Sequence, residues 1–250
     1  ACMWQTYYFL LLWHMINLSV NINKIATLRN SRGGQYPSVV GAAIKCQEFG
    51  ADGITIHPRP DERHITKNDV YSIKPIIKTE YNIEGFPSVD FIKMVIDVKP
   101  NQVTLVPDSA DVLTSCAGWD TIKFEIYLKE IISEFKQHGI RTSLFVSPNV
   151  EIVSGADRCG ADRIELYTEA YANQYAQNKE KAITPYILAA NKAAELNLGI
   201  NAGHDLNLEN LEYFAKHIVN LEEVSIGHAL IGDAIYLGLE NTIQMYKRLL

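Results

Sequence analysis

The chain has few cysteines and lacks a metal-binding signature. Its four thiols, in 250 residues, show no CxxC or similar spacing, and the sequence contains no HxH or HExxH motif. Such a composition argues against a zinc site and against a disulfide framework. It favours a reducing cytoplasm as the compartment.

Positive charge and long apolar runs are also scarce. The 23 Lys and Arg are outnumbered by 29 Asp and Glu, which argues against nucleic acid or an anionic membrane as the main partner. The apolar run at 7–13 is too short to span a bilayer, and it lacks the basic region and cleavage site of a signal peptide. We interpret residues 1–14 as a non-native or mis-called extension and 15–250 as the domain.

No Pro/Gly/Ser-rich linker or low-complexity tract divides the chain, so a single domain is expected. Eight short apolar runs lead into polar or acid–base residues, with helix-length amphipathic segments between most of them. This alternation favours a single (β/α)8 TIM barrel of eight parallel strands over an open sheet, which more often has five or six. The expected strands are 18–22, 53–57, 81–84, 102–106, 141–146, 162–167, 198–202 and 222–226. The expected helices are 38–49, 67–79, 88–98, 121–138, 149–159, 182–197, 207–218 and 229–249, with loops at 23–37, 107–120 and 168–181.

Four acid–base residues come from four different strand ends: His57, Glu84, Glu165 and His204. A lone histidine is more often structural, but four such groups are hard to explain as core because buried imidazoles and carboxylates are unfavourable without partners. A barrel mouth can tune their pKa values by burial and mutual charge. The residues alone therefore predict a metal-free enzyme that performs carbonyl or imine chemistry on phosphorylated small molecules; a His/Glu metal site is the alternative, but no HxH or HExxH spacing supports it.

Anion-binding groups follow three of the strands. Arg59 and His64 share a proline-stiffened loop after the second strand, and Arg32 lies in a glycine-rich turn after the first. Gly227 and His228 open the segment after the last strand, where a helix N-terminus offers backbone N–H groups to phosphate. Two separated anion sites suggest two phosphorylated substrates or one bisphosphate.

Seven ordered blocks of the sequence resemble the pyridoxine 5′-phosphate synthase family. They are VNINKIATLRNSRGG (20–34), GADGITIHPRPDERHI (50–65), YNIEGFPS (81–88), QVTLVPD (102–108), GADRIELYTEAYA (160–172), INAGHDL (200–206) and VSIGHALIGDAIYLGL (224–239). The resemblance runs from about residue 16 to the C-terminus. It implies a (β/α)8 barrel that condenses 3-amino-2-oxopropyl phosphate with 1-deoxy-D-xylulose 5-phosphate to give pyridoxine 5′-phosphate, phosphate and water, without a cofactor. It also implies a homo-oligomer, up to an octamer.

The same resemblance implies a role for each site residue. His57 would be the proton acceptor, Glu84 a second acid–base group, His204 the proton donor and Glu165 a stabiliser of the transition state. The residues implied to hold the amino-ketone phosphate are Asn21, Arg32, Gly227 and His228. Those implied to hold the deoxyxylulose phosphate are Arg59, His64, Thr114, Asn23 and Lys24. Asp205 stands where the family often has glycine and is expected to give a backbone contact.

One position departs from the commoner family pattern. The family usually has Asn-Ile-Asp-His after the first strand, whereas this chain has Asn-Ile-Asn-Lys at 21–24, the Asn-Lys variant. Lys24 could form a Schiff base or simply attract a phosphate or ketone, and we favour the second because no apolar pocket for pKa depression is evident nearby. Two alternatives stay open: another phosphosugar aldolase or epimerase, and a non-catalytic barrel that binds phosphate esters.

Overall fold

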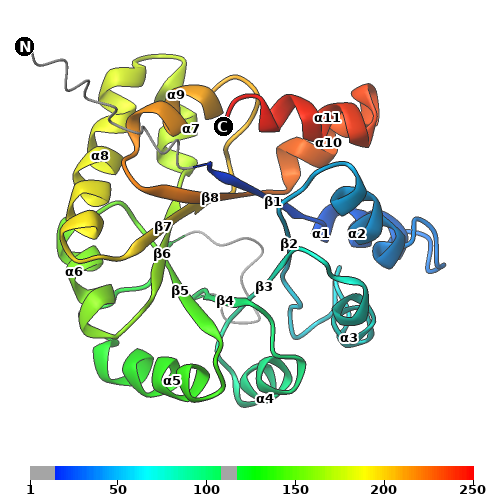
Figure 1. Cartoon of the computed structure of the whole chain (residues 1–250), viewed down its shortest axis with the longest axis horizontal. Helices are drawn as coiled ribbons and strands as arrows, with labels where there is room; N and C mark the ends of the chain where they lie inside the picture. Colours follow the sequence, from blue (N-terminus) through cyan, green and yellow to red (C-terminus); the bar gives the residue numbers. More distant parts are fainter. Residues whose placement is uncertain (1–14, 108–116) are drawn as a thin grey trace, which may run out of the picture.

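The computed structural model describes residues 15–107 and 117–250. Eight parallel strands pair in chain order and close into a barrel, which Figure 1 shows inside a ring of helices. The predicted (β/α)8 architecture is therefore confirmed. The strands are β1 (Asn17–Asn21), β2 (Gly53–Ile56), β3 (Glu80–Gly85), β4 (Gln102–Leu105), β5 (Arg141–Val146), β6 (Arg163–Tyr167), β7 (Gly199–Gly203) and β8 (Leu221–Ile226).

Helices fill the connections between the strands. They are α1 (Asn23–Asn30), α2 (Val39–Glu48), α3 (Lys67–Ile73), α4 (Val89–Val98), α5 (Glu125–Gln137), α6 (Val150–Arg158), α7 (Glu169–Tyr175), α8 (Lys179–Glu195), α9 (Leu211–His217), α10 (His228–Leu237) and α11 (Leu239–Lys247), with a 3-10 turn at Lys74–Ile76. Side-chain N-caps mark several starts, as at Ser38, Ser88 and Asn149. No helix in the described ranges is long and apolar enough to cross a membrane.

Three segments differ from the sequence-based expectation. The expected loops at 23–37 and 168–181 contain α1 and α7, whose polar sequences bury few side chains, such as Ala26 and Tyr171. The expected helix 229–249 is two helices, because Gly238 adopts a φ of 81° that ends α10.

Side chains alternate sharply between the two faces of the barrel wall. The outward residues are apolar and pack on the helices: Leu18 and Ile83 belong to the buried core, and the Tyr81 hydroxyl donates to the Val70 carbonyl of α3 at 3.1 Å. Most inward residues are polar and buried, whereas Phe145 of β5 is apolar and packs on His204. We call the polar ones the lumen set: Ser19, Asn21, Thr55, Asn82, Glu84, Gln102, Thr104, Ser143, Glu165, Asn201, Glu223 and Ser225. Barrel interiors are more often filled with branched apolar residues.

Hydrogen bonds tie the lumen set together across the strands. Ser19 and Thr55 hydroxyls lie 2.7 Å apart, and Asn82 Nδ2 donates to Thr55 Oγ1 at 3.3 Å. Thr104 Oγ1 donates to Asn82 Oδ1 at 3.1 Å. Polar groups buried with partners in this way are tolerated in the interior.

Two arginines close the N-terminal end of the barrel. Arg141 pairs with Glu80, and its Nε donates to Gln102 Oε1 at 2.9 Å. Arg163 pairs with Glu222. Each guanidinium at this end thus has a carboxylate partner of its own.

Two helical glycines give opposite expectations for substitution by alanine. At Gly155, a Cβ would lie 2.2 Å from Thr121 Oγ1, so Gly155→Ala should lower the free energy of unfolding by about 1–3 kcal/mol. At Gly232, nothing lies within 4 Å of the added Cβ, so Gly232→Ala should raise it by roughly 0.5–1 kcal/mol. Urea unfolding of both variants checks this pair, and shifts of the same sign would contradict it.

Candidate active site

The ends of the first three strands converge on the Glu84 carboxylate. His57 directly follows β2, and its Nδ1 lies 3.8 Å from Glu84 Oε2. Asn21 Nδ2, at the end of β1, donates to the same oxygen at 3.4 Å. Asn23 Oδ1 accepts a hydrogen bond from the His57 backbone N–H at 2.9 Å and so holds the backbone from which the imidazole projects. The structure therefore brings the predicted site residues His57 and Glu84 together at one mouth.

Burial sets the proton affinity of this pair. It lowers the pKa of His57 well below its usual value, and the positive charge of Arg59 lowers it further. Burial also raises the pKa of Glu84 to about 8, with the Glu223 carboxylate adding to the shift. The imidazole is consequently neutral near pH 7 and able to accept a proton, next to a carboxyl group that exchanges its proton close to neutrality.

The loop that carries Arg59 and His64, here named the phosphate loop, lies beside His57. Arg59 is 7% exposed, and the His57 and His64 rings meet edge-on at 6.2 Å. The Ile65 N–H donates to His64 Nδ1 at 2.9 Å, which leaves Nε2 as the protonated nitrogen of the neutral ring. Burial lowers the pKa of His64 to about 4, with Arg59 and Lys24 contributing, so Lys24 also lies near this loop.

A residue absent from the sequence prediction holds this loop in place. Arg29 of α1 forms a bidentate pair with Asp69 at 2.5 and 2.9 Å, and its NH2 group donates to the His64 carbonyl at 3.1 Å. Asn30 Nδ2 donates to the same carbonyl at 2.8 Å. Both members of the ion pair are buried. No pattern in the sequence marks Arg29 as buried, since α1 itself was expected to be a loop.

His204 and Glu165 occupy the far side of the mouth. His204 has a left-handed φ of 75°, and its ring packs against Phe145 and Tyr167 at 5.2 and 5.9 Å. Glu165 is 1% exposed, and burial together with the charge of Glu84 raises its pKa well above the usual range. A Cβ on Gly203 would lie 2.8 Å from Glu165 Oε1, so glycine at 203 leaves room for that carboxylate.

The remaining predicted ligands differ in their surroundings. Asp205 donates its backbone N–H to Thr168 Oγ1 at 3.2 Å. Gly227 is buried against Asn21, where a Cβ would meet the Asn21 Cβ at 3.0 Å, and it precedes the first turn of α10. The other three described ligands, Lys24, Arg32 and His228, are exposed. Thr114 lies outside the described residues.

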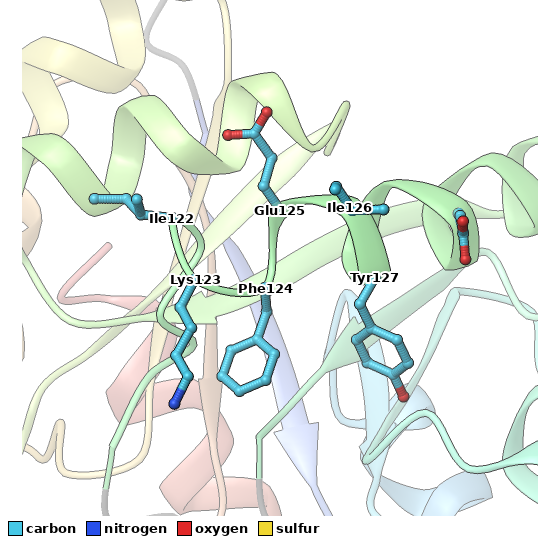
Figure 2. Close-up of a pocket in the computed structure, with 7 residues that line it drawn as sticks. Ile122, Lys123, Phe124, Glu125, Ile126 and Tyr127 are labelled. Carbon is cyan, nitrogen blue, oxygen red and sulfur yellow. The ribbon is translucent and has the colours of Figure 1, made fainter.

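Two hollows accompany these residues. A pocket of about 110 Å³ borders the mouth between the phosphate loop and α4, lined by His57, Arg59, Phe86 and Phe91 among others. A larger hollow of about 570 Å³ lies on the outer layer at the start of α5, and Figure 2 shows its lining, which includes Phe124, Ile126 and Tyr127. Its lining contains none of the predicted site residues.

The buried acids and histidines predict an unusual pH dependence of stability. The folded-state pKa values of Glu84 (about 8) and Glu223 (about 7) exceed the ordinary 4.5, so the folded chain retains protons that the unfolded chain releases. The free energy of unfolding should therefore fall as pH rises from about 5 to 8. His57 and His64 act oppositely: their depressed pKa values stabilise the fold above about pH 6.5, and this contribution is lost towards about pH 4.

Glu165, whose pKa is also raised, adds to the decline, so we expect maximal stability between about pH 5 and 6 and a loss of at least about 2 kcal/mol by pH 9. Urea unfolding at successive pH values measures this dependence. Glu84→Gln should flatten the alkaline decline. A wild-type stability that rises steadily from pH 6 to 9 would contradict the expectation.

Comparisons of the sequence with a family model and with individual relatives agree on one protein family. A family model described as "Pyridoxal phosphate biosynthesis protein PdxJ" matches residues 18–250. Relatives named pyridoxine 5′-phosphate synthase include one from Cytophaga hutchinsonii, 61% identical over 94% of this chain and 98% of its own length. Another, from Bacteroides fragilis, is 58% identical over 94% of this chain and all of its own length.

Solved structures of other enzymes share the barrel at low sequence identity. Thiamine phosphate pyrophosphorylase from Pyrococcus furiosus gives a TM-score of 0.60 at 11% identity, covering 94% of this chain and 95% of that one. Phosphoribosylanthranilate isomerase from Thermotoga maritima gives 0.58 at 14% identity, covering 94% and 98%. At such identities they show the fold alone.

Proposed function

From the premise that this chain belongs to the PdxJ family of pyridoxal phosphate biosynthesis proteins, we propose that it makes pyridoxine 5′-phosphate from 3-amino-2-oxopropyl phosphate and 1-deoxy-D-xylulose 5-phosphate. The products besides pyridoxine 5′-phosphate are phosphate and water. The chain is thus an enzyme of vitamin B6 biosynthesis. The observation that carries the proposal is the neutral His57 imidazole 3.8 Å from the high-pKa Glu84 carboxyl at the barrel mouth.

The proposed acid–base roles follow from these environments. His57 accepts a proton, because burial keeps it neutral. Glu84 exchanges protons near neutral pH, since its pKa lies at about 8. His204 donates a proton from the opposite side, and Glu165 stabilises charge in the transition state. Imine formation, phosphate elimination and ring closure are successive proton transfers, which positioned acids and bases can perform without metal or cofactor.

The proposed phosphate contacts divide into two groups. Arg59 and His64, supported by Asn23, Lys24 and Thr114, hold the deoxyxylulose phosphate. The N-terminus of α10 at Gly227 and His228, with Asn21 and Arg32, holds the amino-ketone phosphate. Asp205 adds a backbone contact. In this scheme Lys24 is a fixed positive charge and takes no part in proton transfer.

The test is an assay of the purified chain on the two phosphates, with a chelator present, following pyridoxine 5′-phosphate by its absorbance. Sustained product formation is expected. Absence of product while both phosphates bind would favour a non-catalytic phosphate-ester barrel instead, and product only without chelator would overturn the metal-free mechanism.

We also propose that the chain works as a homo-oligomer in the cytoplasm, up to an octamer, with no nucleic-acid or membrane partner. Exposed apolar side chains on the helical layer support self-association: Ile126 of α5 is 78% exposed and Tyr236 of α10 is 87% exposed. The two described cysteines are unpaired and buried, as suits a reducing compartment. Light scattering during size-exclusion chromatography distinguishes an oligomer from a monomer.

A further inference from the structure

Glu223 is a buried acid to which the proposed roles assign no function. It lies on β8 and is 1% exposed. Asn201 Nδ2 donates to its Oε1 at 3.4 Å. In the barrel register, Asn201 of β7 pairs with Glu223 on one side and with Glu165 of β6 on the other. Glu223 is therefore two strands away from Glu165, on the same inner face of the wall.

Three carboxyl groups consequently share the lumen: Glu84, Glu165 and Glu223. Each is at most 2% exposed. Their charges act on one another, since Glu223 raises the pKa of Glu84, Glu84 that of Glu165, and Glu165 that of Glu223. Arg59 lowers the pKa of Glu84, and Arg163 and Arg141 lower that of Glu223, but burial and the neighbouring carboxyl groups outweigh these cations. Buried like charges cannot all ionise near neutral pH, and such groups titrate as a unit.

The arginines at the base of the barrel do not remove this excess of acid. The charged groups that act on Glu223 come from β5, β6 and its own strand: Arg141, Arg163, Glu165 and Glu222. Arg141 pairs with Glu80, and Arg163 pairs with Glu222. Each arginine is thereby matched by one carboxylate, and the three lumen acids remain in excess.

Unpaired polar atoms point to protons as the means of relieving this repulsion. Within the described residues, Glu165 Oε2 and Ser143 Oγ are buried without a hydrogen-bond partner. Both belong to the lumen set, and the Ser225 hydroxyl of the same set is a hydrogen-bonding neighbour that lowers the pKa of Glu84. In the same part of the chain, no three His, Cys, Asp or Glu side chains are grouped so that they could hold a metal ion.

We propose that Glu223 is a positioning residue for the reaction, which sets the pH at which Glu84 exchanges its proton. The negative charge of Glu223 holds the proton on Glu84, and its neutralisation releases that proton more readily. The proposal rests on the acid–base role given to Glu84 above. It differs from a purely structural role for Glu223 because it predicts a change in titration as well as in stability.

The first test is the pH profile of kcat for Glu223→Gln. The acidic limb should move to lower pH by about one unit, because the repulsion on Glu84 is gone. Glu223→Asp, which keeps the carboxylate, should stay within about 0.3 units of the wild-type profile. Asp52→Asn is the matched control: Asp52 accepts the Leu18 N–H at 2.9 Å outside the lumen, so its loss should affect stability and leave the profile in place. An unshifted limb in folded Glu223→Gln, or an equal shift in Asp52→Asn, would overturn the proposal.

The second test needs no turnover, so it separates this proposal from the proposed function. Infrared difference spectra of the wild-type chain, without substrates, report the carbonyl stretch of protonated carboxyl groups. Such bands should be present at pH 6 and disappear in steps between about pH 6 and 9. In Glu223→Gln the remaining band should titrate at lower pH. If the wild type shows no protonated carboxyl at pH 6, Glu223 does not control Glu84, whether or not the variant folds.

Discussion

Replacing Glu84 by glutamine is expected to lower kcat by a factor of about 10²–10⁴. The amide is nearly isosteric with the carboxyl group and can still contact Asn21, which donates to Oε2 at 3.4 Å. It cannot exchange a proton with the substrate or support the His57 imidazole as a charge partner at 3.8 Å. The dissociation constants of the two phosphates should change by less than about threefold, because the amide keeps its contact with Asn21 and the other proposed anion contacts lie elsewhere.

A matched control lies on the same strand. Glu80 begins β3 at the opposite end of the barrel, where it pairs with Arg141. Glu80→Gln should lower stability and leave kcat within about twofold of the wild type, because no reacting group is near. Steady-state kinetics and equilibrium binding decide between the outcomes. A Glu84→Gln variant that retains more than a tenth of wild-type kcat, or that loses phosphate binding, would remove Glu84 from its proposed role.

Replacing Arg29 by methionine is expected to lower the free energy of unfolding by about 3–5 kcal/mol. The change leaves the buried Asp69 carboxylate without its bidentate partner at 2.5 and 2.9 Å. It also removes one of the two hydrogen bonds that the His64 carbonyl accepts from α1, so the phosphate loop is held less firmly. KM for the phosphorylated substrates should rise more than kcat falls, because the affected groups bind phosphate.

The double variant Arg29→Met with Asp69→Asn separates charge from packing. Neutralising Asp69 removes the uncompensated charge, so at least half of the lost stability should return. Lys45→Met provides the surface comparison: Lys45 pairs with Glu48 at 2.7 Å on an exposed face and should contribute less than about 1 kcal/mol. Equal losses in Arg29→Met and Lys45→Met would contradict the assigned importance of the buried pair.

The barrel could be predicted because two independent features of the sequence mark each strand. The side chains that face the helices are apolar, as with Leu18 and Val20, and a polar or acid–base residue follows each apolar run. The helices α1 and α7 could not be predicted in the same way. Their sequences are polar and their stability comes from a few tertiary contacts, such as the Tyr171 hydroxyl donating to the Asn210 carbonyl at 2.8 Å.

The candidate site shows the same division. The positions of His57 and Glu84 after β2 and within β3 were predictable, since strand ends of a barrel meet at one mouth. The importance of Arg29 was not, because an arginine in a polar segment has no local mark of burial. Glu223 carried a weak signal: it lies two residues before Ser225, and strand alternation places both on one face. Which residues of the other strands lie near Glu223 is known only once the strands are paired into a closed barrel.

The polar lumen also affects how the stability of this barrel responds to temperature. Exposure of polar surface on unfolding lowers the heat capacity by about 0.26 cal/mol/K per Å², whereas apolar exposure raises it by about 0.45. Residues such as Asn82, Gln102 and Asn201 occupy positions that valine or leucine fill in other barrels. The heat capacity change of unfolding is therefore smaller than for a barrel of equal length with an apolar interior. Its curve of stability against temperature is correspondingly flatter.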